Sequence, residues 1–135
     1  MAAEDIAQLR YLQELYMERY ETISHEIKRR MEYMQELNNV SATLDGTDSI
    51  SGRRVLYPIG ADFYIGATAE KEQKCIVGVG AGYLLEKGVD EAKEFAARLL
   101  KSGEESLSEL MKEKEVIENA MLEISYKIGS AEQQE

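Results

Sequence analysis

Residues 55–65 read VLYPIGADFYI and residues 75–85 read CIVGVGAGYLL, so the same pattern returns after twenty residues without a gap. Runs of Val, Ile, Tyr and Phe separated by Gly-containing turns are typical of β-hairpins. Each copy is therefore predicted to form one hairpin that turns near its Gly-Ala pair. Gly60 and Gly80 are free to adopt the positive φ that such a turn requires.

Two such hairpins do not form a complete folding unit. Isolated hairpins are marginally stable in water, and the apolar content of residues 53–88 exceeds what so small a sheet can bury. Unpaired strand edges also favour pairing with other chains. We expect the sheet to complete its core by assembly with sheets of other subunits. Pro58 is expected near a strand end, where a missing N–H costs least.

The glycines at 78, 80 and 82 raise the alternative of a phosphate-binding loop. A dinucleotide fingerprint needs a strand, then G-x-G-x-x-G, then a helix that receives the pyrophosphate. Here the spacing is G-x-G-x-G, and the strand-like run YLLEK follows. The repeat accounts for Gly80 as a turn residue. The sequence therefore favours a hairpin over a nucleotide site.

The segment before the hairpins, residues 1–45, is predicted to be a coiled-coil helix. From residue 4 to residue 45 it contains no proline and no glycine and is rich in good helix formers. Its apolar residues recur every three and four positions, which is the pattern of a coiled-coil seam. Asp45-Gly46 supplies a C-terminal stop. The predicted seam consists of Ala2, Ile6, Leu9, Gln13, Tyr16, Tyr20, Ile23, Ile27, Arg30, Met34, Leu37, Ser41 and Leu44.

The last segment, residues 89–135, repeats this pattern. Asp90 is expected to cap a helix that begins after Gly88. Gly103 interrupts the seam and predicts a bend, with a break into two shorter helices as the alternative. Lys114 is a second interruption. The predicted seam consists of Ala96, Leu100, Leu107, Leu110, Ile117, Met121, Ile124, Ile128 and Ala131.

Two helices of about 40 residues, each roughly 60 Å long, flank an insert, residues 46–88, that contains both hairpins. The economical arrangement is an antiparallel pair that leaves both termini together at a tip. The predicted fold class is thus α+β, a long antiparallel coiled-coil helical hairpin with two central β-hairpins as an oligomerisation base. In this register Arg30 lies opposite Glu104 and Glu105, either as a paired polar layer or as an arginine snorkelling out of the seam.

Composition excludes several classes of protein. Of the 135 residues 31% are charged and 44% hydrophobic, and no stretch approaches the roughly 20 apolar residues of a bilayer span. No signal sequence is recognisable, and Cys75 is the single cysteine. We therefore expect a soluble, cytoplasmic protein without an intrachain disulfide. The net charge of −10 disfavours nucleic acid as a partner.

No residue set predicts catalysis or metal binding. His25 lies outside the seam and has no second His or Cys to complete a zinc site. Cys75 lies in an apolar run and is more easily understood as a small core residue than as a nucleophile. The many carboxylates are consistent with solvated helix surfaces. The sequence therefore predicts no enzyme and no cofactor.

Some apolar residues near both termini lie outside the predicted seam. They either widen the contact between helices or subunits, or form an exposed surface that binds partners. Met and Tyr suit adaptable contacts with varied sequences. These residues are Tyr11, Leu12, Leu15, Met17, Leu122 and Tyr126.

The arrangement of two long helices around two tandem hairpins resembles the alpha subunit of archaeal prefoldin. The closest likeness lies in VLYPIGADFYIGA (55–67) and CIVGVGAGYLLEKGVDEAKEF (75–95). The resemblance covers nearly the whole chain as a single prefoldin-like domain, 1–135. It implies a hexamer of two alpha and four beta subunits. It also implies an ATP-independent chaperone that holds unfolded polypeptides at its coiled-coil tips and passes them to a group II chaperonin.

The resemblance also suggests roles for residues. Client binding is expected near the tips, at Ile6, Leu9, Leu12, Ile124 and Ile128. Subunit assembly is expected at Val55, Leu56, Ile59, Phe63, Ile65, Ile76, Val77, Val79, Tyr83 and Leu85. The competing hypothesis is a structural coiled-coil spacer or adaptor without chaperone activity, since fold alone does not determine function.

Overall fold

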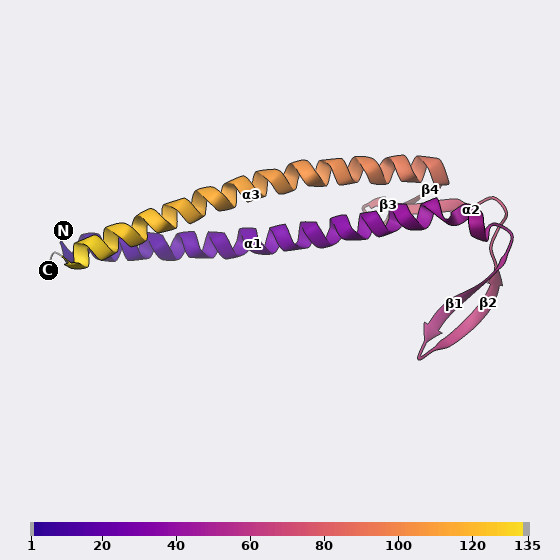
Figure 1. The fold of residues 1–135 in the computed structure, drawn as a ribbon, viewed down its shortest axis with the longest axis horizontal. Helices are drawn as coiled ribbons and strands as arrows, with labels where there is room; N and C mark the ends of the chain where they lie inside the picture. Colours follow the sequence, from indigo (N-terminus) through magenta and orange to yellow (C-terminus); the bar gives the residue numbers. More distant parts are fainter. Residues whose placement is uncertain (1, 134–135) are drawn as a thin grey trace. The chain divides into compact units, whose positions relative to one another are not determined.

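The computed structural model describes residues 2–133 and has a long helix at each end with β-strands between (Figure 1). This confirms the predicted fold class. The elements in chain order are α1 (Ala3–Asp45), α2 (Thr47–Ile50), β1 (Arg54–Gly60), β2 (Phe63–Thr68), β3 (Lys74–Gly80), β4 (Tyr83–Gly88) and α3 (Val89–Gln133).

The chain contacts divide into two compact units. The helical unit contains the described residues up to Tyr33 and those from Ser102 onward. The hairpin unit is Met34–Lys101, with all four strands and the adjoining turns of α1 and α3.

In the helical unit the two helices run antiparallel, so the first turns of α1 lie beside the last turns of α3 (Figure 1). The core is a cluster of Ile23, Ile27 and Ile117, against which Tyr16, Tyr20, Leu107, Leu110 and Met121 pack. All eight belong to the predicted seams. The three- and four-residue spacing therefore identified the buried face of both helices, because side chains three and four positions apart share one face.

Two of the polar seam residues find partners across the helix pair. The Gln13 amide donates a hydrogen bond of 3.0 Å to the hydroxyl of Ser125. The Lys114 ammonium lies 5.2 Å from the centre of the Tyr20 ring, in a cation–π arrangement. Arg30 is exposed, which agrees with the snorkelling interpretation of its place in the seam.

The start and the middle of α3 differ from two of the expectations. The helix begins at Val89, so Asp90 lies within its first turn and does not cap it. There its carboxylate faces the positive end of the helix dipole. Gly103 lies inside one uninterrupted helix of 45 residues, so the alternative of two shorter helices is wrong.

In the hairpin unit, Leu37 and Leu44 of α1 and Ala96 of α3 are buried, as their seam positions predict. Ala92, one helical turn before Ala96, extends the seam beyond its predicted start. The Lys93 ammonium lies 3.1 Å from the carboxylate of Asp45. α1 ends at Asp45 as expected, and the short helix α2 after Gly46 was not anticipated.

The strands form two separate two-stranded antiparallel sheets, β1–β2 and β3–β4. Their registers are the same when one is shifted by twenty residues: Arg54 pairs with Thr68, and Lys74 pairs with Gly88. Each sheet has a bulge at the equivalent place, between Pro58 and Gly60 or between Gly78 and Gly80. The predicted internal repeat is therefore a structural repeat.

Both hairpins turn through two residues with positive φ. In the second, Ala81 has φ 50° and Gly82 has φ 78°, between Gly80 and Tyr83. Positive φ at both central residues defines a type I′ turn, whose twist matches that of paired strands. Gly80 itself has φ 104°, as predicted for the turn glycine. The glycine-rich stretch thus belongs to a hairpin, and the helix begins after its second strand.

Candidate functional site

The first candidate surface covers both hairpins, and we call it the hairpin surface. Its side chains are exposed within this chain even though they are large and apolar. Phe63 is 67% exposed, Ile76 68% and Tyr83 71%. The surface consists of Leu56, Tyr57, Ile59, Phe63, Tyr64, Ile65, Ile76, Val79, Tyr83, Leu84 and Leu85.

Eight of the ten predicted assembly residues belong to the hairpin surface, while Val55 and Val77 are half-buried. The expected set omitted Tyr57, Tyr64 and Leu84, which are also exposed. Successive strand residues face opposite sides, so a run in which every residue is apolar presents an apolar side chain to both faces. That continuous run is the signal that could have identified them.

The second candidate surface lies at the end of the helical unit where Arg10 pairs with Glu132. The predicted client-binding residues differ in how far their side chains are exposed. Leu12 is 40% exposed, whereas Ile6 and Leu9 are half-buried. Ile124 and Ile128, at 6% and 9%, are buried in the seam. A bound polypeptide reaches those two isoleucines only if the helices separate.

Five exposed apolar residues at this end lie outside the seam. We call them the terminal apolar residues: Tyr11, Leu12, Leu15, Leu122 and Tyr126. Leu122 and Tyr126 are 69% and 78% exposed and four residues apart, so they are neighbours on one face of α3. Tyr11 and Leu15 have the same spacing on α1. Large side chains that remain in water on both helices form a candidate binding surface.

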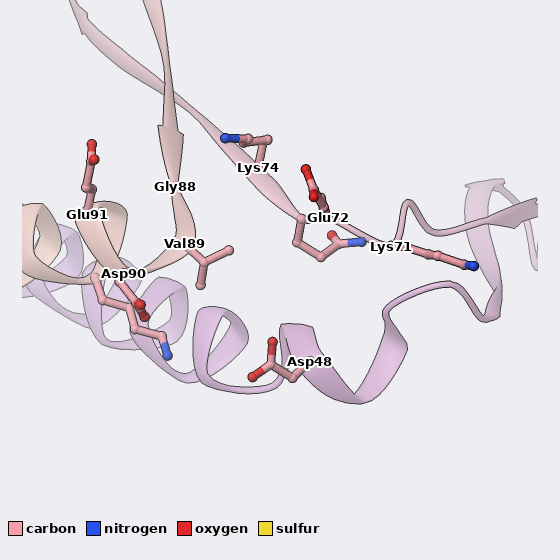
Figure 2. A pocket seen from close by; sticks show the side chains of 10 residues that line it. Asp48, Lys71, Glu72, Lys74, Gly88, Val89, Asp90 and Glu91 are labelled. Atoms are coloured by element: carbon pink, nitrogen blue, oxygen red, sulfur yellow. The ribbon is translucent and has the colours of Figure 1, made fainter.

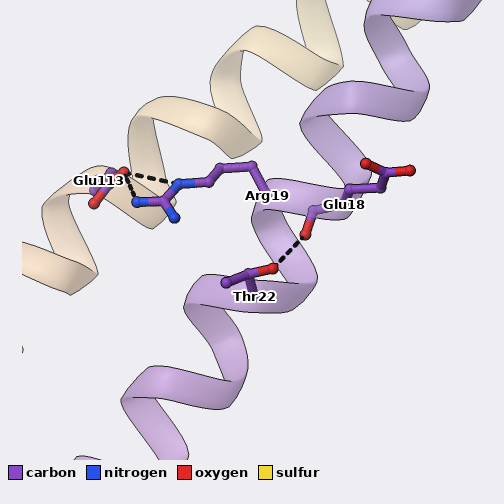
Figure 3. A network of polar contacts seen from close by, with 4 residues as sticks. All are labelled: Glu18, Arg19, Thr22 and Glu113. Carbon is purple, nitrogen blue, oxygen red and sulfur yellow. Dashed lines mark hydrogen bonds and ion pairs between the residues drawn. The ribbon is translucent and has the colours of Figure 1, made fainter.

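Polar contacts connect the helices beside this surface. The guanidinium of Arg19 donates two hydrogen bonds, of 2.7 and 3.2 Å, to one carboxylate oxygen of Glu113 (Figure 3). This hydrogen bond and the negative charge of Glu113 raise the pKa of Arg19 above its ordinary value. Thr22, one turn along α1, donates to the carbonyl of Glu18 at 3.0 Å. The ion pair between Arg19 and Glu113 is exposed, so dissolved salt screens the attraction between its charges.

A hollow in the hairpin unit is the third candidate (Figure 2). Carboxylates and ammonium groups alternate around it, and the labelled side chains point in different directions rather than toward one point. Within residues 2–133, no group of three His, Cys, Asp or Glu side chains is arranged to hold a metal ion. The lining residues are Asp48, Lys71, Glu72, Gln73, Lys74, Gly88, Val89, Asp90, Glu91 and Lys93.

Among the described residues, none of the helices combines the length and the hydropathy that crossing a bilayer requires.

Comparison with known proteins places this fold in a family. A "Prefoldin subunit" family model matches residues 16–134. The alpha prefoldin subunit of Thermofilum pendens is 30% identical over 92 residues, which cover 67% of this chain and 68% of that protein. The alpha prefoldin subunit of Methanopyrus kandleri is 40% identical over 62 residues, which cover 45% of this chain and only 40% of that longer protein.

A solved structure agrees with the sequence comparisons. A chain of the filamentous PFD from Methanocaldococcus jannaschii is 27% identical and superimposes with a TM-score of 0.53. The match covers 90% of this chain and 96% of that chain. The family model and the curated relative from Thermofilum pendens each cover most of the sequence. This chain belongs to the prefoldin family.

Proposed function

We propose that this chain is a subunit of an ATP-independent holdase chaperone of the cytoplasm. In this proposal it captures unfolded polypeptides at the terminal end of its paired helices and passes them to a group II chaperonin. Membership of the prefoldin family supports the chaperone class. The single observation that carries the proposal is the exposure of the terminal apolar residues, led by Tyr126 at 78% and Leu122 at 69%.

Client binding at this surface has a direct physical basis. Unfolded polypeptides expose apolar side chains, and each Å² of apolar surface removed from water contributes about 25 cal/mol. Contacts of this kind have no directional requirement, so one surface can hold many different sequences. We assign client contact to Leu12 together with Tyr11, Leu15, Leu122 and Tyr126. The half-buried Ile6 and Leu9 extend this surface toward the seam.

We propose further that the hairpin surface joins this chain to beta-type prefoldin subunits in a hexamer of two alpha and four beta chains. Two isolated two-stranded sheets do not reach independent stability in water. Phe63, Ile76 and Tyr83 each leave more than half of their surface exposed in the single chain. Partner strands and side chains that cover them supply the missing core.

The client-binding proposal is tested with a pair of matched double variants. Leu122→Ser with Tyr126→Ser removes two terminal apolar residues, and Met111→Ser with Val116→Ser removes two exposed apolar residues earlier on the same helix. Each assembled complex is mixed with several unrelated denatured proteins without ATP, and light scattering follows their aggregation. We expect the first variant to lose most of the protection and the second to keep it.

A truncation provides a second test of the same surface. Removing residues 1–10 and 126–135 should weaken suppression of aggregation while native mass measurement still finds the assembled complex. Equal protection by the truncated and full-length chains would contradict a role for Ile6, Leu9 and Tyr126 in client binding. A complex that protects clients but does not bind a group II chaperonin would contradict only the transfer step.

A structural spacer or adaptor is the second candidate, and one observation favours it. Exposed apolar residues also occur away from the terminal end, where they suit lateral contact with a folded partner. They include Met31, Tyr33, Met111 and Val116, which are 52%, 49%, 47% and 67% exposed. A spacer would fail to slow the aggregation of unrelated proteins, and the Met111→Ser with Val116→Ser variant would then lose a specific partner.

A further inference from the structure

One face of the first hairpin combines a cation with exposed apolar side chains. Alternate residues of a strand point to the same side, and so do residues directly opposite each other in an antiparallel pair. Arg54 therefore shares a face with Leu56, Tyr64 and Gly66, and we call these four residues the Arg54 face. Leu56 is 62% exposed and Tyr64 is 56% exposed, so this face is open to a partner.

The guanidinium of Arg54 fills space that a side chain at position 66 would need. A Cβ atom at Gly66 would lie only 3.0 Å from Nη2 and 3.2 Å from Nε of Arg54. Gly66 is the cross-strand partner of Leu56, so the guanidinium lies next to that apolar side chain. A guanidinium already held against the strand loses less side-chain freedom when a partner binds than one that extends into water.

No carboxylate of the hairpin unit forms an ion pair with this guanidinium. The ion pair within this unit joins Lys93 to Asp45. Asp62 is the one carboxylate in residues 54–68, and it lies in the turn at the other end of the hairpin. At about 3.3 Å per residue, the length of β1 separates it from Arg54 by about 20 Å. The Arg54 face thus carries one uncompensated positive charge.

The second hairpin carries a carboxylate at the equivalent place. A shift by twenty residues relates Arg54 to Lys74 and Gly66 to Glu86. The matching face of the second hairpin therefore has one cation and one anion and is neutral overall. It also presents an exposed apolar residue, Ile76, where the first hairpin has Leu56. The two hairpins thus offer similar apolar surfaces that differ in charge.

We propose that Arg54 receives a carboxylate of the beta-type subunit that covers Leu56 and Tyr64, so that charge decides which partner surface the first hairpin accepts. This inference rests on the proposed hexamer and names one contact within it. A partner that removes Leu56 and Tyr64 from water also covers the guanidinium beside them, and an unpaired charge taken out of water is costly. A carboxylate offsets that cost because it accepts two parallel hydrogen bonds from a guanidinium.

Neutralisation of the two equivalent cations tests this contact. Calorimetric titration measures the dissociation constant between this chain and a beta-type prefoldin subunit at low and at high ionic strength. Arg54→Gln should raise it about tenfold at low ionic strength and less at high ionic strength, because salt screens the attraction that is lost. Lys74→Gln is the matched control and should change it less than about twofold. Arg54→Lys keeps the charge without the planar fork and should recover part of the affinity.

A carboxylate supplied by the chain itself tests the same contact. Gly66→Glu copies the second hairpin and places an anion against Arg54, where it competes with the carboxylate of the partner. Gly66→Gln adds similar bulk without charge, and both variants displace the guanidinium from Gly66. The difference between them isolates the charge, so we expect Gly66→Glu to bind the beta-type subunit more weakly than Gly66→Gln. Circular dichroism of the free chain checks that each variant stays folded.

The outcomes separate this inference from the proposed function. The contact is overturned if Arg54→Gln binds like the natural chain, if Lys74→Gln loses as much affinity, or if the two Gly66 variants bind equally. A loss that does not depend on ionic strength also overturns it, because Arg54 then only supports the hairpin. If Arg54→Gln weakens only the association between copies of this chain, the carboxylate belongs to a second copy and the contact is wrong.

In each of these cases a complex that assembles and protects clients leaves the proposed function standing. A natural chain that binds no beta-type subunit contradicts both.

Discussion

Two isoleucines illustrate how differently the two units are completed. Ile23 in the helical unit is 0% exposed because Ile27 and Ile117 surround it. Ile76 in the hairpin unit is 68% exposed, on a strand rich in apolar residues. The paired helices bury their apolar stripe within the chain, whereas each two-stranded sheet lacks a layer to pack against. The difference indicates that the coiled coil is stabilised within one chain, whereas we propose that the hairpins are stabilised by assembly.

The largest effect expected from this comparison comes from substitution of the buried isoleucine, Ile23. Ile23→Ala should lower the free energy of unfolding by about 3 kcal/mol, because it removes buried methyl groups and leaves a cavity. Urea unfolding followed by circular dichroism at several protein concentrations measures it. Ile76→Ala is the matched control and should leave the unfolding of the helices unchanged. A similar loss in both variants would remove the distinction between the units.

The next effect concerns assembly. Phe63→Ser removes a side chain that is 67% exposed in the single chain and is proposed to pack against a partner. We expect the dissociation constant of the complex to rise about tenfold or more, as for truncated aromatic anchors of interfaces. Sedimentation over a dilution series measures it. Met31→Ser, at a 52% exposed helix position, is the control. Unchanged dissociation of the Phe63→Ser complex would argue that the first hairpin lies outside the interface.

A smaller effect tests whether an apolar pair in the seam would stabilise the two helices more than the present polar pair. Replacing the polar pair by Gln13→Leu with Ser125→Ala should raise the free energy of unfolding by about 1 kcal/mol, because apolar surface replaces a solvated hydrogen bond. Thermal denaturation measures the gain. Gln35→Leu, which disrupts an exposed hydrogen bond to Asn39, should give none. Destabilisation by the double change would show that the polar pair stabilises the helix pair.

The smallest effect acts inside one hairpin. Ala81→Asn places the preferred Asn-Gly sequence in the type I′ turn, where Ala81 has φ 50°. Asparagine tolerates this region better than alanine, so the second hairpin should gain about 0.5–1 kcal/mol. Amide hydrogen exchange measures it, and the unchanged first hairpin serves as an internal control. If amide exchange slowed equally in both hairpins, the added stability would not come from the turn.

Local patterns were sufficient for most of the fold. Apolar spacing identified Ile23, Ile27 and Ile117 as core because helix geometry fixes which positions share a face. The twenty-residue repeat identified both hairpins because Gly60 and Gly80 each mark the turn. The start of α3 directly after Gly88 agrees with the sequence, whereas the cap role expected of Asp90 is wrong, because a first-turn aspartate resembles a cap in sequence.

The candidate site was less predictable. Ile124 and Ile128 were assigned both to the seam and to client binding, and the structure buries them. Partners across the seam, such as Lys114 over Tyr20, depend on the alignment of two distant segments, which periodicity within one helix does not determine. Exposure of Tyr57 and Leu84 depends on whether a second layer covers the sheet, which the residue pattern of a single strand does not determine.

The pairing of Arg10 near the start of α1 with Glu132 near the end of α3 has a mechanical consequence. Force applied between these two ends pulls the helices apart sideways, so their contacts break one turn at a time. The Arg10 pair would open first, then Gln13 from Ser125, then Arg19 from Glu113, before Ile23 and Ile117 separate. Sequential peeling of this kind needs less force than shearing all contacts together. Fluorophores attached to the two ends would report the earliest step of such opening.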